Sequence, residues 1–136
     1  ARQWLGGDPD AGALLKGRFA IFNLWRVLSQ PPQDCPLCMA DATTVEARDL
    51  VISHIVLPTP DGEMRMQTNM VAFNPRHRWV YFSDMDQGDA LIFKTNDSDR
   101  AFAHNVPHSA FDDPSCPKGV PTRTSIEMRA IAYWFE

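Results

Sequence analysis

The sequence of 136 residues lacks several features that would place it in a class of protein at once. It has no apolar run long enough to span a bilayer, so a membrane-spanning helix is excluded. Basic residues are not in excess: 13 Lys and Arg against 17 Asp and Glu give a net charge of −4. Neither nucleic acid nor an anionic membrane is therefore expected as a partner. Its first residues lack the pattern of a signal peptide and position 1 is not Met, so we expect a piece of a longer protein.

Cysteine is scarce, and its arrangement excludes an obvious disulfide framework. Cys35, Cys38 and Cys116 are an odd number, which suits a reducing cytoplasm. Cys35 and Cys38 have the Cys-x-x-Cys spacing of a zinc knuckle or a redox pair. Zinc would need a second pair of ligands, and a redox pair should lie between a strand and a helix, not after the loop "SQPPQD". We interpret the thiols as small, partly buried side chains; a zinc module that adds His104 or His108 is the less favoured alternative.

Helical periodicity is also nearly absent, and strand patterns dominate. Segments rich in β-branched and aromatic residues end at Pro, Gly, Asn or Asp, at 17–28, 49–58, 63–73, 78–83, 90–97 and 123–135. Brief helical turns are expected only within 12–17, 42–50 and 84–90. No repeat or linker divides the chain, so residues 1–136 form a single all-β domain. A jelly roll is attractive because small ligands and metals bind at its open end, but the pattern alone does not separate it from an immunoglobulin-like sandwich.

Four histidines are candidates for binding a metal. His54 lies inside an apolar strand and is interpreted as a core or edge residue, whereas His77 follows Asn-Pro and is interpreted as a turn residue that bonds to backbone. His104 and His108 are four residues apart, but Pro107 between them opposes a shared helical face. His108 is therefore the candidate ligand, with His104 as its neighbour.

An Arg-x-Ser pair opens the last predicted strand. Arg123 and Ser125 have equal parity, so their side chains point to the same face of that strand. A guanidinium that points into an apolar interior is unfavourable unless it is paired, and no acidic residue stands at an obvious facing position. A bound carboxylate would pair with Arg123 in a bidentate fork, and Ser125 would add a donor. The alternative is that Arg123 lies solvated at the rim.

Five strings occur in order along the chain: "GRFAIFNLWRVL", "FNPRHRWVYFSDM", "ALIFKTNDSD", "PHSAFDDPSCP" and "PTRTSIEMRA". Together they resemble a family of fungal and bacterial hydroxylase/desaturases of secondary metabolism, relatives of the cephamycin methoxylase component and gibberellin desaturases. That family is similar to iron(II)- and 2-oxoglutarate-dependent oxygenases, which are built on a double-stranded β-helix, a jelly roll. The resemblance covers most of the chain. It implies the C-terminal part of such an enzyme, with a jelly roll that is incomplete at its N-terminal side.

The resemblance also implies roles for single residues at the iron. His108 matches the distal histidine of a site made by two histidines and one carboxylate, which leaves positions open on iron. Arg123, fifteen residues later, matches the residue that binds the distal carboxylate of 2-oxoglutarate, with Ser125 assisting.

Further matches lie away from that centre. Asn23, Trp25 and Arg26 match the string N-x-W-R and are candidates for the wall of a substrate pocket. Lys94 and Asp97 match another string, and we interpret them as structural. Other aromatic residues, Trp79 and Phe111, are either pocket or core.

The implied activity is hydroxylation or desaturation of a small-molecule substrate, with Fe(II) as cofactor and 2-oxoglutarate as cosubstrate. One departure stands against it, because the chain contains no His-x-Asp or His-x-Glu triplet to supply the other two ligands. Either those ligands precede Ala1, or the chain is a relative that keeps the fold without iron. A non-catalytic jelly-roll module that binds a small acid or a protein partner is therefore the alternative function. The open edges of an incomplete barrel leave an oligomer open as well.

Overall fold

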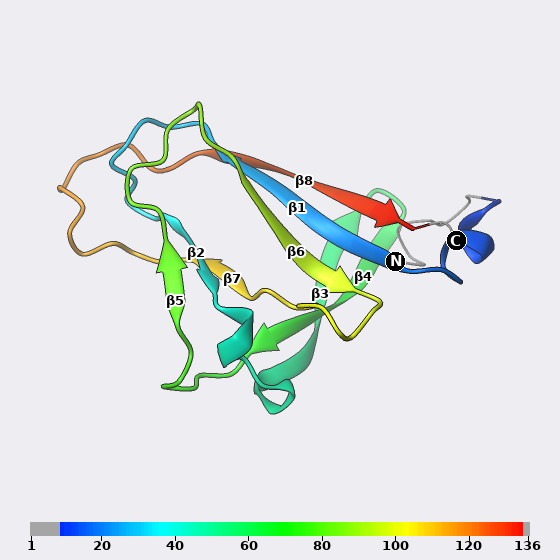
Figure 1. The fold of residues 1–136 in the computed structure, drawn as a ribbon. Coiled ribbons are helices and arrows are strands. Elements are labelled where there is room, and N and C mark those ends of the chain that lie inside the picture. The colour runs from blue at the N-terminus through cyan, green and yellow to red at the C-terminus, as the bar shows by residue number, and fades with distance from the viewer. Residues whose placement is uncertain (1–8, 135–136) are drawn as a thin grey trace.

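Antiparallel strands form most of the regular structure in the computed structural model, which describes residues 9–134 (Figure 1). The strands are β1 (Phe19–Val27), β2 (Leu37–Ala40), β3 (Leu50–Thr59), β4 (Gly62–Val71), β5 (Trp79–Tyr81), β6 (Leu91–Asp97), β7 (His108–Ala110) and β8 (Ser125–Tyr133). The short helices are α1 (Ala11–Leu14), η1 (Ala42–Thr44) and η2 (Ala47–Asp49). None of the helices in the described range is long and apolar enough to cross a membrane.

The predicted all-β class is confirmed, and each predicted strand segment contains an observed strand. Of the predicted helical turns, the one within 84–90 is wrong. There the Asp86 carboxylate accepts from the backbone of Gly88 at 2.6 Å, and the Asp89 carboxylate accepts from the backbone of Asp86 at 3.0 Å. Such local side-chain bonds offer the backbone an alternative to the helical ladder.

Two antiparallel sheets, ordered β6-β1-β8 and β5-β2-β7, face one another as separate layers in Figure 1. One buried apolar cluster lies between them: Trp25, Val27 and Phe93 come from one sheet, Leu37 from the other, and Met85 from the connection between β5 and β6. Burying this cluster is the main favourable term that holds the two layers together. The predicted jelly roll is confirmed, with three strands in each sheet over the described residues.

Strands β3 and β4 pair with each other as a separate two-stranded hairpin. Gly62 closes its turn with a φ of 131°, a conformation that L side chains rarely adopt. The hairpin leaves several large apolar side chains exposed to solvent: Val51, Ile52, Ile55, Val56, Leu57, Met64 and Met70.

A buried carboxylate fastens the base of this hairpin. Asp49, the residue before β3, accepts hydrogen bonds from the backbone of Glu46 at 2.9 Å and from Asn74 Nδ2 at 3.1 Å. His77 Nε2 lies 3.0 Å from the same carboxylate. The prediction that the His77 ring bonds to backbone is therefore wrong, because its partner is a side chain that comes from 28 positions away in the sequence.

Replacing Asp49 with asparagine should lower the midpoint of thermal unfolding by about 5 °C near neutral pH. The backbone N–H of Glu46 and then His77 lower the pKa of Asp49 to about 2. Because this pKa lies below the unfolded value of about 3.9, the carboxylate stabilises the fold above that value and loses its effect as pH falls through about 2. Thermal melts across this range should converge for the two proteins in acid. Asp61→Asn, an exposed change in the hairpin turn, is the matched control. Equal midpoints near neutral pH would contradict the prediction.

Candidate active site between the two sheets

Alternation along β1 decides which of its side chains enter the space between the sheets. Asn23, Trp25 and Val27 are buried on the inner side, as their shared parity predicts. Arg26 lies on the opposite, exposed side, where its guanidinium donates to the backbone carbonyl of Gln87 at 2.7 Å. The structure therefore brings Asn23 and Trp25 to the interior together and leaves Arg26 outside it.

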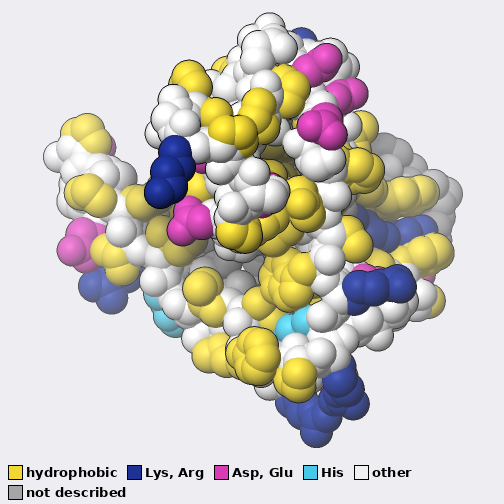
Figure 2. Space-filling view, turned by 90° about the vertical axis from the view of Figure 1, so that its left-hand side faces the viewer, with side chains coloured by type: hydrophobic (Ala, Val, Ile, Leu, Met, Phe, Trp, Pro, Cys, Tyr) yellow, Lys and Arg dark blue, Asp and Glu magenta, His cyan; other side chains and the backbone are white. Residues whose placement is uncertain are grey.

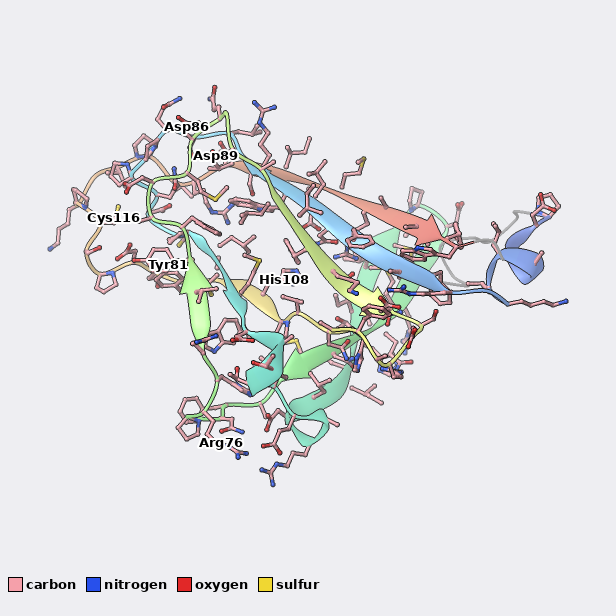
Figure 3. All side chains as sticks on the ribbon, viewed as in Figure 1. Arg76, Tyr81, Asp86, Asp89, His108 and Cys116 are labelled. Carbon is pink, nitrogen blue, oxygen red and sulfur yellow. The ribbon has the colours of Figure 1, made fainter. Side chains whose placement is uncertain are left out.

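His108 stands at the start of β7, on the side of that strand that faces β6 and β1 (Figure 3). Its ring contacts the ring of Phe93 edge-on, with centroids 4.7 Å apart. His108 Nδ1 lies 3.0 Å from the carbonyl oxygen of Val106. A histidine whose Nδ1–H donates to backbone presents the lone pair of Nε2, which is the usual arrangement of a metal ligand. The other candidate, His104, bonds the carbonyl of Phe102 at 3.2 Å.

The Arg123 guanidinium is half-buried beside the apolar cluster. It donates to the Cys35 carbonyl and to Ser125 Oγ, and its Cζ lies 5.3 Å from the centroid of the Trp25 ring. The backbone N–H of Arg123 donates to Asp34 at 2.9 Å. The structure thus brings Arg123, Ser125 and Trp25 together. The two side-chain bonds use two of the five N–H donors of a guanidinium, so a carboxylate could take others.

The histidine and the arginine flank the same cluster from different strands. His108 contacts Phe93 and Arg123 stacks on Trp25, and both aromatic residues belong to the buried group between the sheets. An apolar surrounding strengthens the attraction between a cation and an anion because it removes competing water. The arrangement can therefore bind a small acid at Arg123 and a metal or a polar group at His108.

Within residues 9–134 there is no group of three His, Cys, Asp or Glu side chains that could hold a metal ion. His108 fits the role of one neutral imidazole ligand, because of its bond to Val106. The described residues thus fit one of the three ligands that an iron site of this kind needs.

The cysteines have other partners. Cys35 Sγ donates to Asp112 at 3.1 Å, and this hydrogen bond raises the pKa of the thiol. Burial raises the pKa of Cys38, whose Sγ donates to the carbonyl of Ser109 at 3.1 Å. No third His, Cys, Asp or Glu joins the cysteines in a group that could hold a metal ion within residues 9–134. This geometry opposes the zinc module.

An open cleft of about 530 Å³ reaches the core from the side of β5. Its lining includes Met85 of the buried cluster and Leu91, which packs against that cluster. Tyr81 also lines it and makes an edge contact with Phe111, with centroids 4.9 Å apart. Figure 2 views the molecule from the left-hand side of Figure 1 and shows hydrophobic side chains gathered in the middle of that face. Ser83, Asp84 and Asp89 line it as well, so the cleft has both apolar and acidic walls at the edge of the buried cluster.

The sequence prediction missed two exposed residues of β8 that lie on the same face of the sheet as Asn23 and Trp25. Glu127 pairs with Trp25 and Arg129 pairs with Asn23, and paired residues of adjacent strands share a face. Arg129 Nε donates to Asn23 Oδ1 at 3.1 Å, and Arg129 Nη2 lies 3.5 Å from Glu127 Oε1. Both have the parity of Arg123 and Ser125, so extending the alternation along the strand would have found them.

Comparison with known proteins shows which family the chain resembles. The sequence profile of a family described as an oxidoreductase/YMDC permease-like domain matches residues 1–133. The hydroxylase/desaturase efuI from Hormonema carpetanum is 37% identical over 135 residues, which cover 93% of this chain and 45% of that protein. The Fe(II)/2-oxoglutarate-dependent dioxygenase nvfI from Aspergillus novofumigatus is 33% identical over 125 residues, which cover 91% of this chain and 44% of that protein.

A solved structure agrees with these sequence matches. The iron and alpha-ketoglutarate-dependent endoperoxidase NvfI superposes with a TM-score of 0.79 at 32% identity, over 97% of this chain and 47% of that chain. The chain therefore spans about half the length of the relatives it matches.

Proposed function

This chain belongs to the oxidoreductase/YMDC permease-like family, and on that premise we propose that it forms the 2-oxoglutarate-binding part of an iron(II)-dependent oxygenase. The proposed reaction is hydroxylation or desaturation of a small-molecule substrate, as the names of its relatives indicate for those proteins. The observation that carries the proposal is Arg123, which stacks on Trp25 and donates to Ser125, with His108 on the other flank of the same buried cluster. The three described cysteines are free thiols, which suits work in a reducing cytoplasm.

Each residue of the site has one task in this proposal. Arg123 binds the distal carboxylate of 2-oxoglutarate, and its bond to the Cys35 carbonyl holds the guanidinium in place. Ser125 adds a hydroxyl donor to the same carboxylate. His108 offers Nε2 to the metal, in the orientation that Val106 imposes on the ring.

The iron, when bound, supplies the chemistry that activates oxygen toward a C–H bond. The protein supplies the setting for it. Phe93 and Trp25 keep water away from the space between His108 and Arg123, since both are buried. Tyr81 and Leu91 supply apolar walls to the open cleft beside the buried cluster, where a small organic molecule would enter.

A second function is favoured by one observation, the single imidazole at the centre of the described site. A chain with one metal ligand would act as a module that binds a small acid through Arg123 and Ser125 without chemistry. Both functions require 2-oxoglutarate or a similar acid to bind. They differ in whether the acid is consumed.

Replacing His108 with alanine should reduce succinate formation from 2-oxoglutarate, in the presence of Fe(II) and oxygen, by about 100-fold, because the site loses its imidazole ligand. The polypeptide is assayed at its full length as produced, and succinate is quantified by chromatography. His104→Ala is the matched control and should leave the rate unchanged. Unchanged turnover in the His108 variant would refute its role. A wild-type protein that binds 2-oxoglutarate but makes no succinate would favour the binding module.

A further inference from the structure

One polar side chain between the sheets has an unused donor. Asn23 is fully buried, and its Oδ1 accepts from Arg129 Nε at 3.1 Å. Its Nδ2 is also buried and has no hydrogen-bond partner in the part of the chain that the structure describes. The bond from Arg129 fixes which end of the amide is the acceptor, so Nδ2 is held as a donor without a partner. Such a buried donor is unfavourable in the free protein.

This donor lies at the level of His108. Strand register places Phe93, Asn23 and Arg129 side by side across β6, β1 and β8. The ring of His108 contacts Phe93, the direct neighbour of Asn23 in this row. Ser125 instead pairs with Val27, four residues further along β1, which is about 13 Å at the rise of a strand. The Asn23 amide is therefore separate from the pair proposed to hold the cosubstrate.

The charges around Asn23 balance. Arg129 is the cation beside the amide, and Glu127 lies 3.5 Å from it as the counterion. A cation that is already paired adds little attraction for a second anion. A neutral oxygen is consequently the better partner for Nδ2 than a carboxylate.

We propose that Asn23 is a substrate-binding residue whose amide donates to a neutral carbonyl or hydroxyl oxygen of an apolar small molecule. Arg129 is a positioning residue, because it acts through the amide of Asn23, and Glu127 holds Arg129. The inference rests on the proposed function insofar as this molecule is the substrate. It names the class of that substrate: a mostly apolar compound with an uncharged oxygen near the reacting carbon.

The test measures binding of small probes to the full polypeptide by ligand-observed NMR titration. The probes are cyclohexanone, the apolar control methylcyclohexane, and cyclohexanecarboxylate. Cyclohexanone should bind the wild type more tightly than the other two. Asn23→Leu keeps the branching at Cγ and removes the donor, so it should weaken cyclohexanone binding about fivefold and leave methylcyclohexane unchanged.

Further variants protect the test from a folding failure. Asn23→Asp keeps the acceptor for Arg129 but lacks the donor, so it should also weaken cyclohexanone binding. Arg129→Met should weaken cyclohexanone binding. Arg129→Lys should retain part of the affinity, since Lys can donate to Asn23 Oδ1. Tyr133→Phe removes another buried, unpartnered polar atom, the Tyr133 hydroxyl, from the far end of β8 and should change nothing. Thermal melts report whether each variant is folded at the temperature of the titration.

Two outcomes would overturn the inference. One is equal affinity of the wild type for cyclohexanone and methylcyclohexane, and the other is unchanged cyclohexanone binding in Asn23→Leu. Binding of 2-oxoglutarate is measured on the same samples. If 2-oxoglutarate does not bind but cyclohexanone does, the result counts against the proposed oxygenase only. If cyclohexanone does not bind but 2-oxoglutarate does, the result counts against the role of Asn23 only.

Discussion

Replacing Arg123 with glutamine is expected to weaken binding of 2-oxoglutarate by about 100-fold, because two charge-assisted hydrogen bonds to the carboxylate are lost. The guanidinium is half-buried against Trp25, so water replaces it poorly. Isothermal titration calorimetry on the full polypeptide measures the effect directly. Arg123→Lys should retain part of the affinity, since it keeps the charge but loses the planar fork.

The matched control for this variant is Arg26→Gln. It removes the same charge from the exposed side of β1 and should leave 2-oxoglutarate binding within about twofold. Ser125→Ala should weaken binding by about fivefold, the effect of one neutral hydrogen bond. If Arg123→Gln and Arg26→Gln had the same small effect, the cosubstrate would have to bind elsewhere, and both proposed functions would fail.

Replacing Asp97 with asparagine is expected to cause the largest loss of stability, a fall of about 10 °C in the midpoint of thermal unfolding. The Asp97 side chain is fully buried at the end of β6. It accepts from Arg18 Nη2 at 3.0 Å and from Lys94 Nζ at 2.7 Å, and from the backbone of Asp99 at 3.0 Å. The neutral amide would leave two cations without their counterion.

The loss should spread beyond the ion pair. Asp97 holds the Arg18 guanidinium between two rings, with Cζ 3.9 Å from the centroid of Phe102 and 4.3 Å from that of Trp134. Cation–π contacts of this kind add to the stability of the region. An Arg18 without Asp97 is free to leave both rings.

The stability of this site should depend on pH in one direction. The hydrogen bonds from Arg18 and then Lys94 hold the pKa of Asp97 far below its usual range. The carboxylate therefore stabilises the fold above the unfolded pKa of about 3.9, and this contribution is lost as pH falls through the depressed folded value. Wild-type melts should fall below about pH 4, and melts of Asp97→Asn should fall less. Asp61→Asn should follow the wild type, and a parallel decline in Asp97→Asn would refute the prediction.

Much of the fold was predictable because strand patterns are local. Asn23, Trp25 and Val27 have equal parity along one strand pattern, and the structure buries all three. Arg123 and Ser125 likewise have adjacent side chains because they are two residues apart on one extended segment. Neither prediction required knowledge of the partner strand.

The missed strands are those that depend on a partner. β2 (Leu37–Ala40) and β7 (His108–Ala110) are too short to show alternation, and they exist as strands because they pair with each other and β2 also pairs with β5. That pairing includes His108, whose ring contacts Phe93 of the other sheet. A short segment becomes a strand only when its hydrogen-bonding groups meet another strand.

Some features of this protein thus follow from the local sequence pattern, and others follow only from tertiary contacts. Residue type and alternation suffice for the all-β class, the shared side of Asn23 and Trp25, and the pairing of Arg123 with Ser125, since each depends on neighbours along one strand. The bond from Arg129 to Asn23 joins residues 106 positions apart, and the ion pair of Arg18 with Asp97 joins residues 79 positions apart. Register and burial create such contacts, and these are properties of the folded chain that no single segment contains.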